Sequence, residues 1–113
     1  MLASKHRLSK EEDFEKVKRE GQVYQSVSFG ASVLRKKPNK DSRFAFVVST
    51  KISKLAAQRN RIKRALREAA RHNLHIIGKG YDIVFLPKTN IARKSTEEIM
   101  REVKLFIIKQ LVK

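Results

Sequence analysis

Basic side chains at helical spacing are the residues of this chain best suited to chemistry, and that chemistry is phosphate binding. Residues 51–80 hold nine Lys or Arg and one acid, Glu68, a net charge of +8. At about 100° per residue, one flank of a helix would carry Arg59, Asn60, Lys63, Arg64, Arg67 and Arg71. The planar guanidinium group of arginine can donate two parallel hydrogen bonds to one phosphate. Since phosphates would relieve the repulsion along this flank, we predict that it contacts nucleic acid.

The composition of the whole chain also favours a polyanionic partner and excludes several classes of protein. The chain has 113 residues, 27 of them Lys or Arg and 11 Asp or Glu, and its net charge is +16. Its 41% hydrophobic content suffices for one small core, so we expect a single domain over residues 1–113. The lack of cysteine excludes disulfides and thiolate zinc sites. Without a membrane-span pattern or a signal peptide, we expect a soluble, cytoplasmic protein.

The elements that position the basic flank follow from periodicity and turn signals. A capping box at Ser9 and Glu12 predicts a helix that ends near Gly21. After a weak strand over 22–25, alternation predicts strands over 27–33 and 43–50, joined as a hairpin through a turn at 38–41. Along the second of these strands, Phe44, Phe46 and Val48 should point into the core.

The second half of the chain gives the clearest patterns. Residues 54–74 predict the basic helix, with Ser53 as N-cap and a core-facing stripe of Leu55, Ile62, Leu66 and Ala69. Residues 81–86 read as a buried strand ended by Pro87. A capping box at Ser95 and Glu98 opens a last helix, whose apolar stripe is Ile99, Val103, Phe106, Ile107 and Leu111. The order α-β-β-β-α-β-α predicts an α+β fold, about four strands packed by three helices.

Residues 59–64 read R-N-R-I-K-R, and in their context they resemble the bacterial ribonuclease P protein subunit. The strand end Ser49-Thr50-Lys51 precedes this motif, and the pair Arg67-Glu68 follows it. The Asp13-Phe14 pair, Gly21, the Gly-Tyr-Asp-Ile-Val stretch at 80–84 and the final helix also match the family's order. The resemblance covers nearly the whole chain.

This resemblance implies a fold, a function and partners. Members are small basic α+β proteins with a left-handed βαβ crossover. They bind a catalytic RNA subunit and the 5′ leader of precursor tRNA, and the assembly removes the leader by hydrolysing one phosphodiester bond. The RNA does the chemistry with Mg²⁺ that it mainly binds itself. We therefore expect an endonuclease subunit without catalytic or metal-binding residues of its own, and without a protein or membrane partner.

Carried over by position, the resemblance divides the site residues into two groups. The catalytic RNA is expected to contact Lys54, Arg59, Asn60, Arg61, Lys63, Arg64, Arg67 and Arg71. The leader cleft is expected to include Phe14, Lys18, Ser32, Arg43, Ser49 and Lys51, with Ser28 and Gly30 beside Ser32 on a small, polar strand surface. Lys18 stands where the family often has a second aromatic ring, so leader contact should depend more on charge and hydrogen bonds.

Other functions remain open from the residues alone. A ribosomal or nucleoid protein could carry the same basic helix, and it would bind ribosomal RNA or duplex DNA without a leader cleft. Membrane disruption is disfavoured because the apolar positions are needed for a core. His72 and His75 could share a helix face, but they lack further zinc ligands nearby in sequence. The acids around Asp13 complement a helix N-terminus more simply than they bind a metal.

Overall fold

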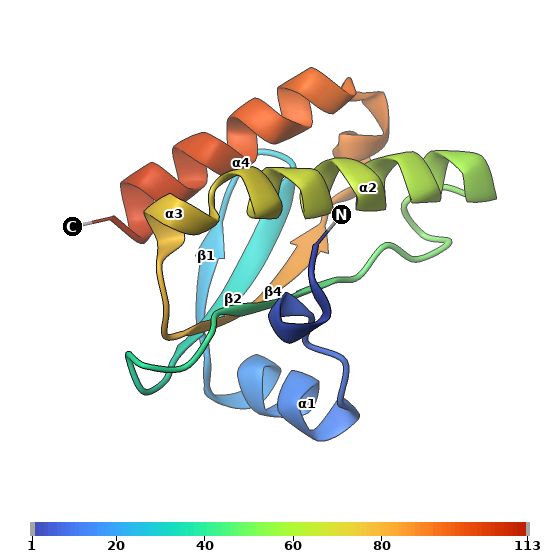
Figure 1. Cartoon of the computed structure of the whole chain (residues 1–113). Helices are drawn as coiled ribbons and strands as arrows, with labels where there is room; N and C mark the ends of the chain where they lie inside the picture. Colours follow the sequence, from blue (N-terminus) through green and yellow to red (C-terminus); the bar gives the residue numbers. More distant parts are fainter. Residues whose placement is uncertain (1, 113) are drawn as a thin grey trace.

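A four-stranded sheet with helices on both faces makes up the described part of the chain, residues 2–112 of the computed structural model (Figure 1). The strands lie in the order β1-β2-β4-β3. Their bounds are β1 Gln22–Gln25, β2 Phe29–Arg35, β3 Arg43–Phe46 and β4 Tyr81–Pro87. The helices are α1 Glu11–Glu20, α2 Ala56–His72, α3 Leu74–Ile77 and α4 Thr96–Gln110, with 3₁₀ turns η1 Ser4–His6 and η2 Thr89–Arg93. The predicted α+β class and order of main elements are confirmed.

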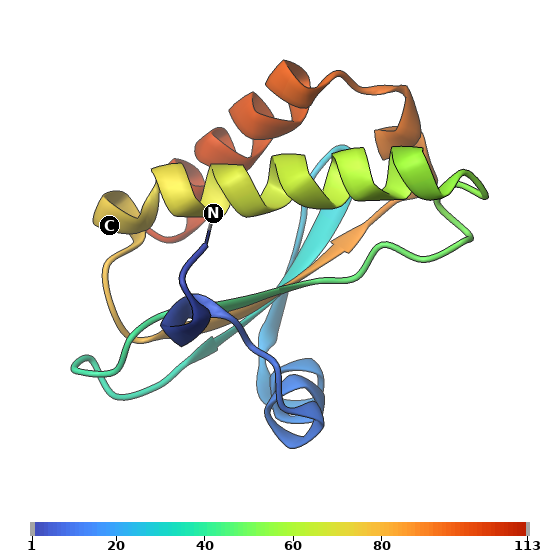
Figure 2. The same cartoon turned by 45° about the vertical axis from the view of Figure 1, so that its right-hand side comes forward.

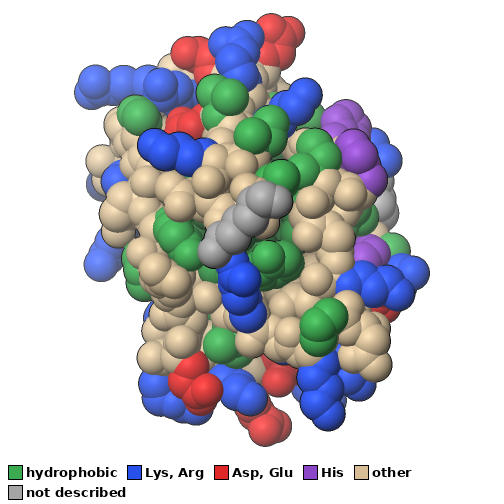
Figure 3. Space-filling view, turned by 90° about the vertical axis from the view of Figure 1, so that its left-hand side faces the viewer, with side chains coloured by type: hydrophobic (Ala, Val, Ile, Leu, Met, Phe, Trp, Pro, Cys, Tyr) green, Lys and Arg blue, Asp and Glu red, His purple; other side chains and the backbone are tan. Residues whose placement is uncertain are grey.

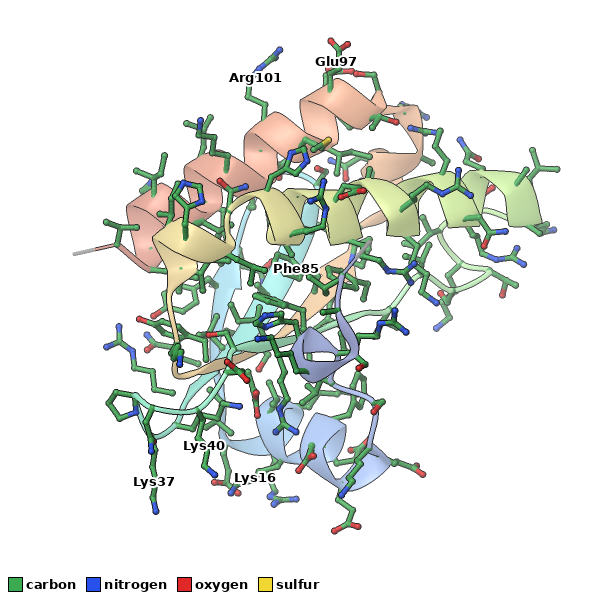
Figure 4. The ribbon with its side chains drawn as sticks, viewed as in Figure 1. Lys16, Lys37, Lys40, Phe85, Glu97 and Arg101 are labelled. Carbon is green, nitrogen blue, oxygen red and sulfur yellow. The ribbon has the colours of Figure 1, made fainter. Side chains whose placement is uncertain are left out.

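The two faces of the sheet are covered unequally. Helices α2 and α4 lie together over one face, whereas α1 alone crosses the other (Figures 1 and 2). Phe85 of β4 lies between the sheet and the α2–α4 layer, where its ring meets Phe29 at 5.5 Å and Phe106 at 6.3 Å between centroids (Figure 4). On the α1 face, a smaller buried cluster joins Val17 to Val84. The open part of that face is therefore set by where α1 lies.

The predicted hairpin between the second and third strands is wrong. Strand β4 lies between them, antiparallel to β2 and parallel to β3. Its residues Ile83, Val84 and Phe85 are fully buried, which suits a central strand with neighbours on both sides. Alternation predicts which side chains share a face but cannot name the pairing partner. As a result, β3, α2 and β4 form a βαβ unit that places α2 across the sheet.

Two predicted helix starts are wrong by one or two residues. Helix α1 begins at Glu11 with Lys10 as N-cap, because the preceding chain is held extended by a 2.9 Å hydrogen bond from Leu8 N–H to Phe44 O. Helix α2 begins at Ala56 with Leu55 as N-cap, so Leu55 is 68% exposed and outside the core stripe. The hydroxyl of Ser53 instead accepts from Leu55 N–H just outside the helix.

The other ends agree better with the sequence patterns. Helix α1 ends before Gly21, where a Cβ would collide with the carbonyl of Val17 and come within 2.7 Å of Ser32 Oγ. Helix α2 stops at His72, since Asn73 turns its side chain back to donate to Ala69 O at 2.7 Å. The capping box of α4 is confirmed, and its predicted stripe is buried.

An ion-pair network around Asp82 fixes α1, β3 and the start of the β2–β3 loop to β4. The Asp82 side chain is 6% exposed and accepts from Arg43 Nη2 and Lys36 Nζ, both at 2.8 Å. Arg43 also donates to Asp13 of α1 at 3.1 Å. Burial alone would raise the pKa of Asp82, but the hydrogen bonds from Arg43 and Lys36 outweigh it and hold the pKa below its ordinary value. The same contacts, led by the hydrogen bond to Asp82, raise the pKa of Arg43.

Replacing Asp82 by Asn should lower the free energy of unfolding by about 2 kcal/mol at pH 7, because the two contacts from Arg43 and the one from Lys36 lose their charged acceptor. A lowered native pKa contributes stability above the ordinary aspartate pKa and loses it as pH falls through the native pKa. The difference in unfolding free energy between wild type and D82N should therefore shrink below about pH 4.

Urea unfolding of both proteins from pH 7 to pH 2.5, at constant ionic strength, measures this difference. D41N, the same charge change at a residue without an ion pair in the described chain, is the control. A pH-independent difference would contradict the assignment.

Candidate nucleic-acid interface

The basic flank of α2 forms a row of accessible cations and one amide, which we call the α2 ridge. Asn60, Lys63, Arg64 and Arg71 are exposed, whereas Arg59 and Arg67 are half-buried. The opposite side of the same helix is buried in the core through Ile62, Ala65, Leu66, Ala69 and Ala70. Burial of that side holds the ridge rigidly, so its charges keep their spacing. The ridge consists of Arg59, Asn60, Lys63, Arg64, Arg67 and Arg71.

The N-terminal end of the ridge is anchored by local hydrogen bonds. Arg59 Nη1 donates to Ser53 O at 3.0 Å, and the Ser53 hydroxyl bonds the amide of Gln58. Gln58 in turn donates to Ala92 O at 2.8 Å, which ties the turn before α2 to η2. Arg59 therefore helps to shape this turn as well as carrying charge. Lys54 lies in the turn, exposed and outside the helix.

The C-terminal end of the ridge is partly neutralised. Arg71 Nε donates to the carboxylate of Glu68, and this hydrogen bond lowers the pKa of Glu68. The two residues are three positions apart on the helix. Arg61 lies half-buried on the far side of the ridge. The least compensated charges are therefore those in the middle of α2.

A shallow groove of about 250 Å³ separates the α2 ridge from the edge strand β3. Lys63 and Arg67 line it from α2, and Arg7 lines it from the N-terminal segment. Sequence reasoning did not single out Arg7, because its place depends on a parallel bridge between Arg7 and Phe44. Such long-range pairing leaves no local pattern. The groove extends the basic surface from α2 onto the segment that covers β3.

Phe14 of α1 is half-buried and faces the open part of the sheet. It packs against the small cluster that contains Val17 and Val84, together with Leu86. The ammonium of Lys18 lies 5.3 Å from the centroid of the Phe14 ring, a cation–π contact. The structure thus brings the two predicted α1 residues together, and Lys18 covers part of the ring rather than extending an aromatic surface.

The predicted exposure of Ser28 and Ser32 is wrong. Ser32 is 1% exposed, and its hydroxyl donates to Val17 O at 2.8 Å, which fastens α1 to β2. Ser28 is fully buried and bonds the carboxylate of Glu102 through both its hydroxyl and its N–H. Burial raises the pKa of Glu102, but these bonds and one from Ser26 outweigh it and lower the pKa. Both serines therefore serve the fold, because helices cover each face of β2.

Arg43 is also committed to the fold. Its guanidinium donates to both oxygens of Asp82 and to Asp13, so its donors are largely used within the protein. Ser49 and Lys51, by contrast, lie exposed in the turn after β3, where Lys51 N–H donates to Ser49 Oγ at 3.3 Å. Val47, at 37% exposed, lies between this turn and the sheet. The side chains of Ser49 and Lys51 are thus accessible at the end of β3.

Candidate metal ligands do not converge in the structure. Within residues 2–112, no three His, Asp or Glu side chains are placed to hold a metal ion. His72 and His75 line a shallow pocket together with Arg101 and Lys104, surroundings that would repel a cation. No helix in the described part of the chain is long and apolar enough to cross a membrane. The arrangement as a whole is suited to binding a polyanion over a basic, partly apolar surface.

Comparisons with known proteins agree with this arrangement. A family model described as Ribonuclease P matches residues 2–110. A ribonuclease P protein component from Pseudanabaena sp. is 34% identical over 112 residues, covering 99% of this chain and 97% of that protein. One from Thermotoga maritima is 37% identical over 97 residues, covering 86% of this chain and 78% of that protein.

Solved structures extend the agreement to the fold. The RNase P protein of Staphylococcus aureus superimposes with a TM-score of 0.84 at 24% identity, covering 96% of this chain and 98% of that one. The RNase P protein from Thermotoga maritima superimposes with a TM-score of 0.79 at 29% identity, covering 91% of this chain and 96% of that one. With R-N-R-I-K-R in helix α2 beside a matching sheet, the chain belongs to the family of ribonuclease P protein components.

Proposed function

We propose that this protein binds the catalytic RNA subunit of ribonuclease P and helps it to remove the 5′ leader of precursor tRNA. The observation that carries the proposal is the α2 ridge, a rigid row of cations whose middle members Lys63 and Arg64 form no ion pair in the described chain. When fixed cations of this kind bind RNA phosphates, they displace the counterions condensed on the RNA, and the release of those counterions favours binding. In bacteria this maturation step belongs to the cytoplasm, where precursor tRNA is made.

The chemistry of cleavage is assigned to the RNA in this proposal. Hydrolysis of a phosphodiester bond requires an activated water and charge stabilisation, which Mg²⁺ supplies. The buried carboxylates of this chain do not fit Mg²⁺, because Asp82 already accepts from Arg43 and Lys36, and Glu102 accepts from Ser26 and Ser28. We therefore derive no catalytic step from the protein's side chains. Its contribution is binding and positioning.

The leader is assigned to the open sheet surface next to Phe14. The half-buried Phe14 ring offers the part of its face that Lys18 leaves uncovered for one base to stack on, and the ammonium of Lys18 can meet a phosphate. Ser49 and Lys51 add a hydroxyl and a charge at the far side of this surface. Ser32 and Arg43, which have committed their polar groups within the protein, act by holding α1 in place.

Replacing Lys63 and Arg64 together by Gln tests the α2 ridge. Each lost phosphate contact should lower the salt slope of binding by about 1, so the double variant should lose about 2 and bind the catalytic RNA at least about tenfold more weakly in 0.15 M salt. Filter binding or fluorescence anisotropy over a range of KCl, at fixed Mg²⁺, measures both quantities. K104Q/K109Q on α4 gives the same charge change away from the ridge. Equal losses in the two double variants would contradict specific contact by α2.

Replacing Phe14 by Ala tests the leader surface. Because a stacked base contributes about 1–3 kcal/mol, the variant holoenzyme should bind precursor tRNA about 5- to 150-fold more weakly, and its affinity for mature tRNA should be nearly unchanged. Affinities for the two RNAs, measured at saturating protein, give the comparison. V23A, at an exposed residue on β1, is a control for loss of an apolar side chain. A loss of equal size for both RNAs would show that Phe14 is not a leader contact.

A further inference from the structure

A second concave basic surface lies on the α1 side of the sheet, apart from the α2 ridge. It encloses about 680 Å³ and is built from η1, α1, the end of β2 and the β2–β3 loop. We call it the loop cradle, and its cations are Lys5, Lys16, Arg35, Lys36, Lys37, Lys40 and Arg43. Arg43 lines it while paired with Asp82 and Asp13. Lys16, Lys37 and Lys40 are seen together at the lower left of Figure 4. A cavity of this size is large enough for a nucleotide-sized group.

Most of the charge in the loop cradle has no internal partner. Lys36 is paired with Asp82, and the Arg35 guanidinium lies 5.6 Å from the Tyr81 ring centroid. Within residues 2–112, Lys5, Lys16, Lys37 and Lys40 form no ion pair. The lining acids are Glu20, which pairs with Arg19, and Asp41. Four ammonium groups from three segments thus repel one another in the free protein, a cost that bound phosphates would remove.

The loop that carries these lysines is fastened to its neighbours. Lys36 N–H donates to Gly80 O at 2.8 Å, and Gly80 N–H donates to Lys40 O at 2.9 Å. Gly80 has a φ of 99°, and its missing Cβ leaves room for the backbone of Pro38. The hydroxyl of Ser42 closes the loop by donating to Gly78 O at 2.8 Å. Because the backbone is tied at several points, the lysine positions are set by the fold.

The loop cradle is continuous with the surface assigned to the catalytic RNA. Lys5 and Arg7 are neighbours in the N-terminal segment, and Arg7 lines the groove beside Lys63 and Arg67 of the α2 ridge. Basic side chains therefore follow one path from α2 across the edge of β3 to the β2–β3 loop. In Figure 3, viewed from the left of Figure 1, Lys and Arg side chains lie on the lower part of the molecule with Asp and Glu side chains among them.

The same placement separates the loop cradle from the leader surface. Helix α1 presents Lys16 and Glu20 to the cradle, whereas Phe14 and Lys18 meet on another flank of the helix. Positions 16 and 20 share one side of a helix, and positions 14 and 18 share another. A leader strand lying on Phe14 would have to pass around α1 to reach the cradle. A polyanion on the α2 ridge would reach the cradle across the edge of β3, past Arg7 and Lys5.

We propose that the loop cradle binds backbone phosphates of the catalytic RNA, as a second contact beyond the α2 ridge. This inference rests on the proposed function, because it takes the RNA on α2 to be the catalytic subunit. The free cations of the cradle are all lysines, whose point charges suit phosphate contact without base readout. The cradle thus adds affinity and fixes the orientation of the protein, and it adds no sequence preference.

Neutralising Lys16, Lys37 and Lys40 together tests the proposal. The triple variant K16Q/K37Q/K40Q should lower the salt slope of binding to catalytic RNA by about 2–3 and raise the dissociation constant at least about tenfold in 0.15 M KCl with fixed Mg²⁺. R101Q/K104Q/K109Q makes the same charge change on exposed residues of α4, where Arg101 points away from the cradle (Figure 4). It should change the constant less than about threefold. Thermal unfolding of both variants checks that the fold is kept.

Several outcomes would overturn the proposal. If both triple variants lower the affinity for catalytic RNA equally, the loss comes from the change in net charge and not from the cradle. A loss confined to precursor tRNA with a long leader, at saturating protein, would assign the cradle to the leader instead. Unchanged RNA affinity, with polyglutamate bound by wild type and not by K16Q/K37Q/K40Q, would assign it to an acidic protein. If neither K16Q/K37Q/K40Q nor K63Q/R64Q weakens RNA binding, the proposed function fails together with the cradle. If K63Q/R64Q weakens RNA binding and K16Q/K37Q/K40Q does not, only the proposal for the cradle fails.

Discussion

The buried charge of Asp82 is the interaction on which the arrangement of this protein's binding surfaces depends. Through Arg43 it joins β3 and α1 to the central strand, and through Lys36 it holds the start of the β2–β3 loop. A carboxylate at 6% exposure is costly unless its acceptors are satisfied, and here both oxygens receive charged donors. The position of α1 decides how much of the sheet remains open beside Phe14. The same network thus shapes the leader surface and one wall of the loop cradle.

This use of acids explains how the chain tolerates a net charge of +16. Several acids are engaged within the fold, where Asp82, Glu102 and Glu98 each accept hydrogen bonds that lower their pKa values. Few acids are then left to compensate the outward-facing cations, which collect on the α2 ridge and in the loop cradle. Repulsion on those surfaces costs stability in the free protein. Bound RNA phosphates would offset this cost. The strongest repulsion between cations therefore lies on the two surfaces where RNA binding is proposed.

Local patterns predicted some elements well and others poorly, for a physical reason. The capping box at Ser95 and the apolar stripe of α4 depend on neighbours three or four residues away, and the sequence displays such neighbours directly. The hairpin prediction was wrong because the partner of β2 is β4, far along the chain. The exposure of Ser32 was misjudged for the same reason, since α1 covers it through Val17. Arg43 was assigned to the leader because its acceptor Asp82 is distant in sequence.

The two-sided placement of α1 gives a physical reason why one small protein can handle two RNAs. Phe14 and Lys18 offer a ring and a charge on one flank, a combination suited to an unstacked base and its phosphate. Lys16 on the other flank lines a cavity that is rich in ammonium groups and has no aromatic ring in its lining. Such a cavity suits the phosphate backbone of an RNA whose bases are already paired. Because α1 is fastened by Ser32 and Arg43 together, a shift of the helix would alter both surfaces at once. On the two assignments proposed above, a shift of this one helix would therefore change the contacts to substrate and to catalytic RNA together.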